Sequence, residues 1–313
     1  MVRRCALILV VLAGTALAVS GAGAHKLPKA PKCPIFPTSN HFNKRVDALA
    51  VAANSPTLIA SIGLDDHVHA DFGSGTYNGG PIGIPYTVVR RKQSKVPVSF
   101  DYADESDGSS YPIPAHAPIE GGANAGGDRH VLVVDRDRCK LYELYDAHPA
   151  NGGASWHAGS GAIFNLKRNK LRPKGWTSAD AAGLPILPGL ARYDEVKRGS
   201  IDHALRFTAR ETRRAYVYPA RHFASSSDDP SLPPMGLRIR LKASADLSGL
   251  GKQALVVARA LKRYGALLAD NGSPWYFSGA PDKRWNNDDL HTLDQLKGSD
   301  FEVVDTSSLP HPG

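Results

Sequence analysis

The sequence predicts a mainly β protein, an antiparallel β-sandwich or jelly roll with a few short helices. Three observations favour this class. Short strand-like runs recur at irregular spacing along the 313 residues. Glycine (30) and proline (23) are concentrated in the loops between them, as turns between short strands require. No regular alternation of strands and helices appears, and a doubly wound parallel sheet would need one.

The first 24 residues are expected to form a cleaved signal peptide. Arg3 and Arg4 precede an apolar run at 6–19, and small residues at 22–24 offer a cleavage site between Ala24 and His25. The alternative is a membrane anchor, but the apolar run is short for a membrane span. We therefore expect a secreted protein with one β-rich domain at 25–313 and no transmembrane anchor.

The N-terminal half of this domain mixes loops, one helix and a hairpin. Residues 25–37 contain four prolines and predict an extended arm, whereas Ser55, Pro56 and Gly63 mark the ends of a short helix. Glycine-rich residues 73–86 predict a loop, and residues 104–127 predict an exposed loop. Residues 130–145 predict a β-hairpin that turns at 135–138. The strands expected over the whole chain are 86–89, 96–102, 130–134, 139–145, 162–166, 203–208, 215–219, 237–242, 266–270, 275–278 and 301–304.

Two helices are expected near the C-terminus. Residues 251–265 carry an apolar face that ends before Gly265, and residues 286–298 carry a leucine stripe that ends before Gly298.

Cysteine usage predicts one disulfide. Of the three cysteines, Cys5 falls in the expected signal peptide, which leaves Cys33 and Cys139 to pair in an oxidising compartment. The alternative is two unrelated buried thiols.

Several long stretches, among them DRHVLVVDRDRCKLYELYDA and GLPILPGLARYDEV followed by HALRFT, resemble a family of secreted, largely actinobacterial proteins. The resemblance covers most of residues 33–305 and implies secretion, but it implies no particular reaction. The chain has no G-x-x-x-x-G-K-[S/T] run, so a nucleotide-binding function receives no support from it.

The densest group of metal-type ligands is the run DDHVHAD. In an extended segment, His67, His69 and Asp71 would share one face and could hold a divalent metal as cofactor. The alternative is a hydrated loop.

Glu143 and His130 are candidate catalytic residues on the predicted hairpin. Glu143 lies among aromatic residues, which suits a general acid or nucleophile in sugar cleavage. A turn near 136–138 places Glu143 almost opposite Val131 and His130 opposite Leu144, and a slip of one residue reverses their faces. The alternative is an exposed, salt-bridged glutamate.

A second candidate group combines imidazole, guanidinium and phenol side chains, as β-elimination of a uronic acid requires. Its catalytic members are His203, His222, Arg206 and Tyr218, with Arg221 as a substrate-binding residue. The alternative is a salt-bridged rim with core-edge histidines.

Tryptophans in or beside loops can stack on sugar rings. Trp156, Trp176 and Trp275 are such candidates, and Asp270 lies in the turn before Trp275. The alternative is that they anchor loops to the core.

The functional hypothesis is an extracellular protein that acts on a polysaccharide as a glycoside hydrolase or lyase, with an acidic glycan as the favoured substrate. The net charge of +8 permits an acidic partner but does not require one. A non-catalytic protein that binds cell-wall glycan is the alternative, since no catalytic motif establishes an enzyme. Acidic residues within the arginine-rich stretch 206–221 argue against a nucleic-acid partner.

Overall fold

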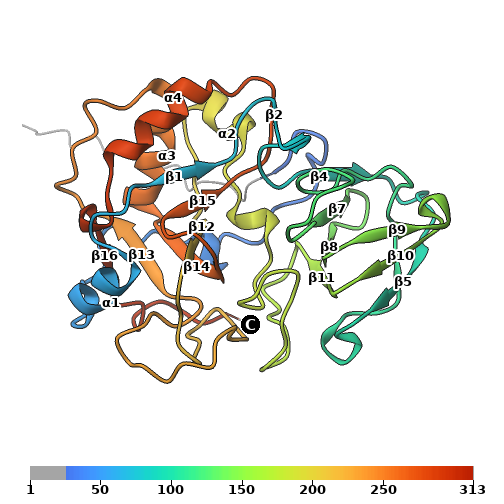
Figure 1. Cartoon of the computed structure of the whole chain (residues 1–313), viewed down its shortest axis with the longest axis horizontal. Coiled ribbons are helices and arrows are strands. Elements are labelled where there is room, and N and C mark those ends of the chain that lie inside the picture. Colours follow the sequence, from blue (N-terminus) through green and yellow to red (C-terminus); the bar gives the residue numbers. More distant parts are fainter. Residues whose placement is uncertain (1–25, 313) are drawn as a thin grey trace, which may run out of the picture.

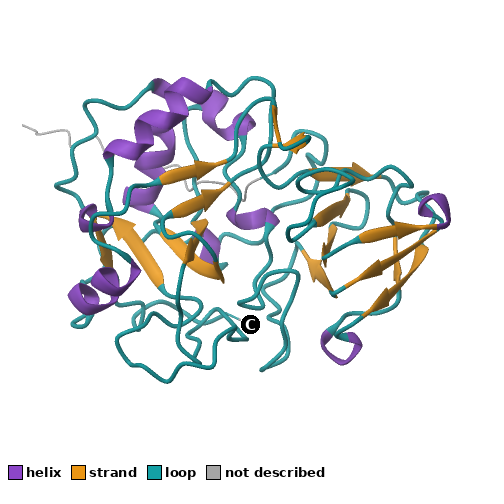
Figure 2. Cartoon of the chain, viewed as in Figure 1, coloured by secondary structure: helices purple, strands orange, loops and turns teal. Residues whose placement is uncertain are grey.

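The computed structural model describes residues 26–312, so the predicted signal peptide lies outside the described residues. Figure 1 shows two lobes side by side: a larger one with most of the helices, and a smaller one made of the strands between β4 and β11. Loops occupy much of both lobes (Figure 2). None of the helices in this part of the chain combines the length and apolar character needed to cross a membrane.

The larger lobe is built on a six-stranded mixed sheet. Its strand order is β1-β15-β12-β14-β13-β16, in which β1 pairs with β15 and β12 with β14 in parallel, and the other neighbours are antiparallel. The strands are β1 (His69–Asp71), β12 (Leu205–Ala209), β13 (Arg238–Leu241), β14 (Ala266–Asn271), β15 (Tyr276–Ser278) and β16 (Phe301–Val303).

One face of this sheet is apolar and the other is polar where β1, β15 and β12 meet. Phe207 of β12 and Phe277 of β15 stack in the core of the larger lobe. Because side chains alternate along a strand, Arg206 and Ser278 lie on the opposite face. Asp71 is paired in register with Ser278 and shares that face. The sheet thus presents charged side chains away from its core.

Helices cover the apolar face and the ends of the sheet. The α-helices are α1 (Ser55–Ile62), α2 (Tyr193–Arg198), α3 (Lys252–Arg263) and α4 (Asn287–His291). Buried residues of α1 and α3 belong to the same core as Phe207 and Phe277. Short 3₁₀ turns lie at His41–Asn43, Ala103–Glu105, Asn151–Gly153, Leu187–Gly189, Thr292–Gln295 and Gly298–Asp300.

The smaller lobe contains two four-stranded sheets with orders β11-β8-β7-β4 and β6-β5-β10-β9. Val133 and Tyr142 of the first sheet share a core with Val98 and Trp156 of the second. The strands are β4 (Tyr86–Val89), β5 (Val96–Phe100), β6 (Ser110–Tyr111), β7 (Val131–Asp135), β8 (Lys140–Tyr145), β9 (His148–Ala150), β10 (Ser155–Ala158) and β11 (Ser160–Asn165), and a separate hairpin joins β2 (Thr76–Tyr77) to β3 (Gly80–Pro81).

The hairpin β7–β8 confirms the prediction for residues 130–145, with a register one residue from the expected one. Leu132 pairs with Glu143, and Val131 pairs with Leu144. The Asp135 carboxylate accepts hydrogen bonds of 3.0 Å from the backbone N–H groups of Asp137 and Arg138, which closes the turn. This local capping sets the register, and the spacing of apolar residues alone did not reveal it.

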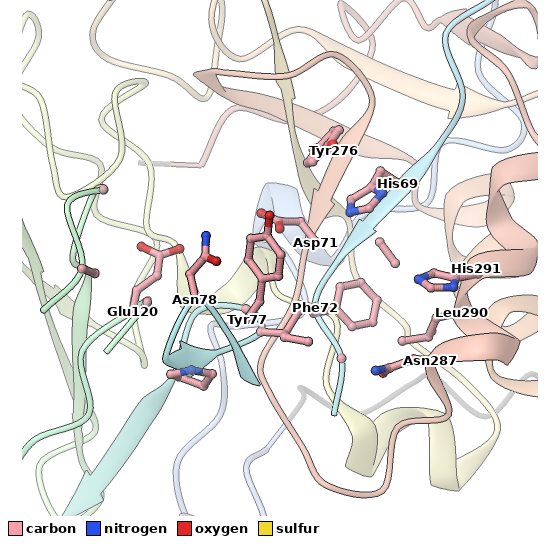
Figure 3. Close-up of a pocket in the computed structure, with 18 of the residues that line it drawn as sticks. His69, Asp71, Phe72, Tyr77, Asn78, Glu120, Tyr276, Asn287, Leu290 and His291 are labelled. Carbon is pink, nitrogen blue, oxygen red and sulfur yellow. The ribbon is translucent and has the colours of Figure 1, made fainter. Parts of the chain in front are cut away.

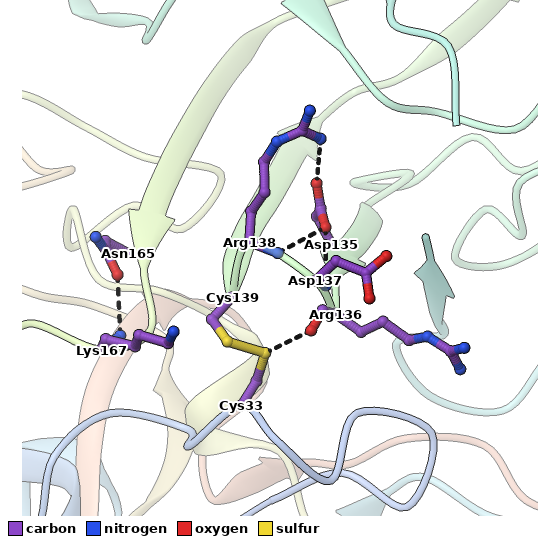
Figure 4. Close-up of a disulfide and its surroundings, with 8 residues drawn as sticks. All are labelled: Cys33, Asp135, Arg136, Asp137, Arg138, Cys139, Asn165 and Lys167. Carbon is purple, nitrogen blue, oxygen red and sulfur yellow. Dashed lines mark hydrogen bonds and ion pairs between the residues drawn. A yellow bond between two sulfur atoms is a disulfide. The ribbon is translucent and has the colours of Figure 1, made fainter. Parts of the chain in front are cut away.

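The predicted disulfide between Cys33 and Cys139 is present (Figure 4). It joins the N-terminal arm to the start of β8, across a sequence separation of 106 residues. Leu27 and Ile35 of the arm are buried in one core with Leu141 of β8. The arm is therefore packed against the smaller lobe.

A mainly β fold with a few short helices is confirmed, although the sheets are mixed and not wholly antiparallel. Four local predictions need correction. The arm predicted at 25–37 is not extended, because turns fold it back and Lys26 forms an antiparallel bridge with Pro34. Residues 215–219 form only an isolated bridge between Tyr216 and Met235. The region 104–127 is not all exposed, because Tyr111 and Ile113 are buried. The helix expected at 286–298 ends at His291 and continues as a 3₁₀ turn.

Candidate functional site

Two adjoining cavities lie beside the polar face of the six-stranded sheet. The large cavity has a volume of about 780 Å³ and the small cavity about 370 Å³. The segment 124–128 borders both, since 124–127 line the large cavity and Asp128 lines the small one. Residues of both lobes contribute to these walls.

Arg206 connects the sheet to the walls of the small cavity. Its buried guanidinium donates from Nη1 to Ser278 Oγ (2.7 Å) and from Nη2 to Asp180 Oδ1 (3.0 Å). Asp270 Oδ2 lies 3.8 Å from Nη2. Arg206 is therefore an internal counter-charge for two carboxyl groups that line the cavity.

His130 holds the backbone beside Asp180. Its Nδ1 lies 2.5 Å from Glu120 Oε2, and its Nε2 lies 2.9 Å from the carbonyl oxygen of Ala179. Although burial opposes it, the Glu120 carboxylate raises the pKa of His130 to about 9. Both ring nitrogens then donate, which fixes the segment that carries Asp180.

The small cavity collects acid–base groups. Asp128, Tyr145, Asp180, His222 and Asp270 all line it. Burial raises the pKa of Asp270 to about 7, and the neighbouring Asp180 adds to this shift while Arg206 opposes it. Burial also raises the pKa of Asp180. Asp270 can consequently hold or release a proton near neutral pH.

The large cavity combines carboxyl groups with aromatic rings. Figure 3 shows Glu120 and Asn78 on one side, His69 and His291 on the other, and Asp71 and Tyr77 between them. Burial among protein atoms raises the pKa of Asp71, and the Glu120 carboxylate raises it further. The ring of His69 stacks on Tyr276 with centroids 4.2 Å apart.

The exposed aromatic side chains gather at these cavities. Among the large hydrophobic residues that are exposed in the described part of the chain, the aromatic ones are Tyr77 (72%), Tyr102 (55%) and Tyr145 (36%). Tyr77 lines the large cavity, and Tyr102 and Tyr145 line the small one. Exposed rings beside carboxyl groups form the kind of surface on which sugar rings stack.

The structure brings together several predicted site residues. His222 and Asp270 line the small cavity, His69 and Asp71 line the large one, and Arg206 and His130 support both from behind. His222 Nδ1 lies 2.9 Å from the carbonyl oxygen of Ala181. These residues come from segments that are far apart in the sequence.

Glu143 lies elsewhere, in the core of the smaller lobe. Its side chain is fully buried and accepts hydrogen bonds of 2.9 Å from the backbone N–H groups of Ile186 and Leu187. Burial raises its pKa to about 7. Glu143 lines neither cavity, and its contacts are those of a structural residue that holds the 186–187 segment against β8.

The other predicted catalytic and binding residues also lie outside the two cavities. His203 Nε2 is 3.2 Å from Glu195 Oε2 in a buried cluster behind α2. Tyr218 donates a hydrogen bond from its hydroxyl to the carbonyl oxygen of Pro312 (3.0 Å). Arg221 donates to the carbonyl oxygen of Arg172 (3.0 Å).

The tryptophans have the positions expected of residues that anchor loops to the core, which was the alternative to stacking on sugar rings. Trp156 and Trp275 are buried in the cores of the two lobes, and Trp275 Nε1 donates to the carbonyl oxygen of Gly63 (2.7 Å). Trp176 is partly exposed beside the guanidinium of Arg172. These rings anchor loops to the cores, and tyrosines take the exposed positions.

The three metal-ligand candidates do not converge. His67 Nδ1 contacts the carbonyl oxygen of Asp294, whereas His69 and Asp71 line the large cavity. Among residues 26–312, no three His, Cys, Asp or Glu side chains are grouped to hold a metal ion.

Sequence reasoning did not select Asp128, Asp180, Glu120 or the three exposed tyrosines. Asp128 stands next to the hairpin motif that it introduces, so its position before a buried strand was an available signal. Asp180 and Glu120 lie in loops, and only the tertiary structure brings them to Arg206 and His130.

Comparison with protein-family models, with curated proteins and with solved structures found no match to this chain.

Proposed function

We propose that the chain is a secreted enzyme that hydrolyses glycosidic bonds of an extracellular polysaccharide in the two adjoining cavities. The observation that carries the proposal is the pair of carboxyl groups at the small cavity. Asp270 has a pKa of about 7, and the exposed Asp128 interacts with it electrostatically. Glycosidases require two carboxyl groups in different environments, one protonated and one ionised.

In this proposal Asp270 is the general acid and Asp128 the base or nucleophile. Asp270 donates its proton to the glycosidic oxygen as the bond to the leaving sugar breaks. Asp128 either removes a proton from the attacking water or attacks the anomeric carbon itself. Arg206 limits how far the pKa of Asp270 rises, because its guanidinium lies 3.8 Å from the carboxylate.

The tyrosines supply the binding surface in this proposal. Tyr77 at the large cavity and Tyr102 and Tyr145 at the small one would stack on successive sugars of a chain that crosses both. We further propose that the two four-stranded sheets form a small sandwich that serves as one rigid wall of this cleft. Their shared core supports this arrangement.

Hydrolysis is better supported than β-elimination. A lyase needs a cation free to neutralise the uronate carboxylate. Arg206 is buried and already bonded to Ser278 and Asp180, so it faces internal partners.

The test is release of new reducing ends from a panel of neutral, acidic and amino-sugar polysaccharides by the mature protein. We expect cleavage of at least one, and loss of that activity in Asp270→Asn. Glu143→Gln, which alters a buried carboxyl group outside the cavities, is the matched control and should keep the activity. Cleavage of none of the panel, or undiminished cleavage by Asp270→Asn, would overturn the proposal.

The second candidate is a non-catalytic glycan-binding protein, which the three exposed tyrosines also favour. The same panel of polysaccharides distinguishes this candidate from the hydrolase. This candidate is supported if the protein retains a polysaccharide without releasing new reducing ends. That binding should be unaffected by Asp270→Asn and weakened by Tyr77→Ala.

A further inference from the structure

The lining of the two cavities is acidic, whereas the chain as a whole is basic. Glu105, Asp128, Asp180 and Asp270 line the small cavity, and Asp71 and Glu120 line the large one. The full sequence carries a formal charge of +8. A cleft with one sign of charge in a protein of the opposite sign attracts ligands selectively.

The two buried cations behind the cavities are already paired with carboxyl groups. Arg206 is bonded to Asp180, and His130 is paired with Glu120. Burial lowers the pKa of His69, so its ring is neutral at neutral pH. In the described part of the chain, neither Asp71 nor Asp128 forms an ion pair with Lys, Arg or His.

One carboxylate oxygen at the small cavity lacks a hydrogen-bond donor. Asp180 is 1% exposed and lines the small cavity. Its Oδ1 accepts from Arg206, but among residues 26–312 its buried Oδ2 has no hydrogen-bond partner. A buried carboxylate oxygen without a donor is costly, and an ammonium group brings both three donors and a positive charge.

We propose that the cleft selects a cationic glycan, a polymer of amino sugars whose amino groups are free and protonated. This inference rests on the proposed function and names its substrate class. The exposed tyrosines stack on the sugar rings, while Asp71 and Asp128 pair with ammonium groups of neighbouring residues. A polymer with acetylated amines keeps the stacking and loses the ion pairs.

The two wall carboxylates line different cavities, each with an aromatic ring beside it. Asp71 faces the large cavity near Tyr77 and Tyr276, as Figure 3 shows. Asp128 faces the small cavity with Tyr145. Each carboxylate thus accompanies an exposed ring, and the segment 124–128 joins the two positions.

The experiment compares the binding of two oligomers of equal length by calorimetry near pH 6. One is a glucosamine hexamer and the other an N-acetylglucosamine hexamer. We expect the wild type to bind the glucosamine hexamer at least about tenfold more tightly, with an affinity that falls as salt rises. Asp71→Asn and Asp128→Asn should each remove most of this preference.

The control is Asp65→Asn, which changes the net charge by the same amount at an exposed carboxylate that lines neither cavity. It should preserve the preference. Equal affinity for the two hexamers, or an equal loss in Asp65→Asn, would overturn the inference.

The outcomes separate this inference from the proposed function. Cleavage of neutral glycans without preference for free amines retains the hydrolase and rejects the cationic substrate. Tight, salt-sensitive binding of the glucosamine hexamer without cleavage of any polysaccharide retains the cationic ligand and rejects the hydrolase.

Discussion

At the scale of single residues, Arg206 has the largest role in the site. It is buried, it bonds to Ser278 and Asp180, and it lies close to Asp270. Removal of one partner from such a buried group leaves the others without a counter-charge, which costs more than the pair contributes.

We expect Arg206→Gln to lower the free energy of unfolding by about 3–5 kcal/mol, because Asp180 then stays buried without its cation. The double variant with Asp180→Asn should recover part of this loss. Urea denaturation of the wild type, the two single variants and the double variant measures both effects. Equal stability of wild type and Arg206→Gln would show that the ion pair makes no such contribution.

His130 makes stability depend on pH in the alkaline range. Its pKa is raised to about 9 in the folded protein, above the ordinary value of about 6.5 in the unfolded chain. The folded state therefore binds the proton more tightly, so this contribution is complete below about pH 6.5 and is lost as the pH rises to about 9.

The expected loss over that window is about 2–3 kcal/mol. Denaturation between pH 6 and 10 measures it, and Glu120→Gln should flatten the dependence because it removes the charge that raises the pKa. A wild-type stability that is constant from pH 6.5 to 9 would contradict the assignment. Asp270 and Glu143, with pKa values of about 7, contribute mainly below this window.

Glu143 illustrates what the sequence can and cannot reveal about a residue. The sequence predicted either a catalytic carboxyl group or an exposed, salt-bridged one, whereas the side chain is buried, and the group that it faces depends on register. The one-residue difference in β7–β8 pairing set Glu143 opposite Leu132, in a core where the backbone at 186–187 satisfies it.

We expect Glu143→Gln to lower stability by about 1–3 kcal/mol, since the amide replaces one acceptor oxygen with a donor that faces backbone N–H groups. Thermal denaturation measures the change. An unchanged melting temperature would contradict the structural role of this carboxylate.

At the scale of elements, local signals predicted much of the fold. Helix α1 follows from Ser55, Pro56 and Gly63, helix α3 from its apolar face, and the β7–β8 hairpin from two apolar runs around a polar turn. Strands β1 and β10 escaped prediction because they have only three and four residues. Such strands are set by their partners in the sheet, which the sequence does not identify.

The disulfide is the element-scale feature with the clearest energetic consequence. It ties the N-terminal arm to the β7–β8 hairpin across 106 residues. Replacement of both Cys33 and Cys139 by serine should lower stability by about 2–5 kcal/mol. Denaturation with and without reductant checks this expectation. Reductant should destabilise the wild type and leave the double variant unchanged. A wild type whose stability does not change after full reduction would contradict the expectation.

At the scale of the whole molecule, the candidate site is a product of the tertiary structure. Its carboxyl groups come from β1, β14, the 3₁₀ turn at Ala103–Glu105 and two loops, and Arg206 of β12 pairs with two of them. Composition and spacing could select Asp270, His222 and Arg206 as reactive residue types. They could not select Asp180, because nothing local to that residue shows that the two lobes meet there.

The net charge of the whole molecule differs in sign from the charge of the groups that line the cavities. The net positive charge permitted an acidic glycan when only composition was considered, without requiring one. The cavities that would receive the glycan are lined with carboxyl groups, so their local charge favours a neutral or cationic one.

The pH dependence of glycan hydrolysis tests the central claim most directly. If Asp270 is the general acid, kcat/KM of the wild type should fall above about pH 7, where this carboxyl group loses its proton. Asp270→Asn should be about 10²–10⁴-fold slower and should lack this alkaline limb. A wild-type rate that does not fall between pH 6 and 9, or an Asp270→Asn variant with the same rate and profile as the wild type, would contradict the claim.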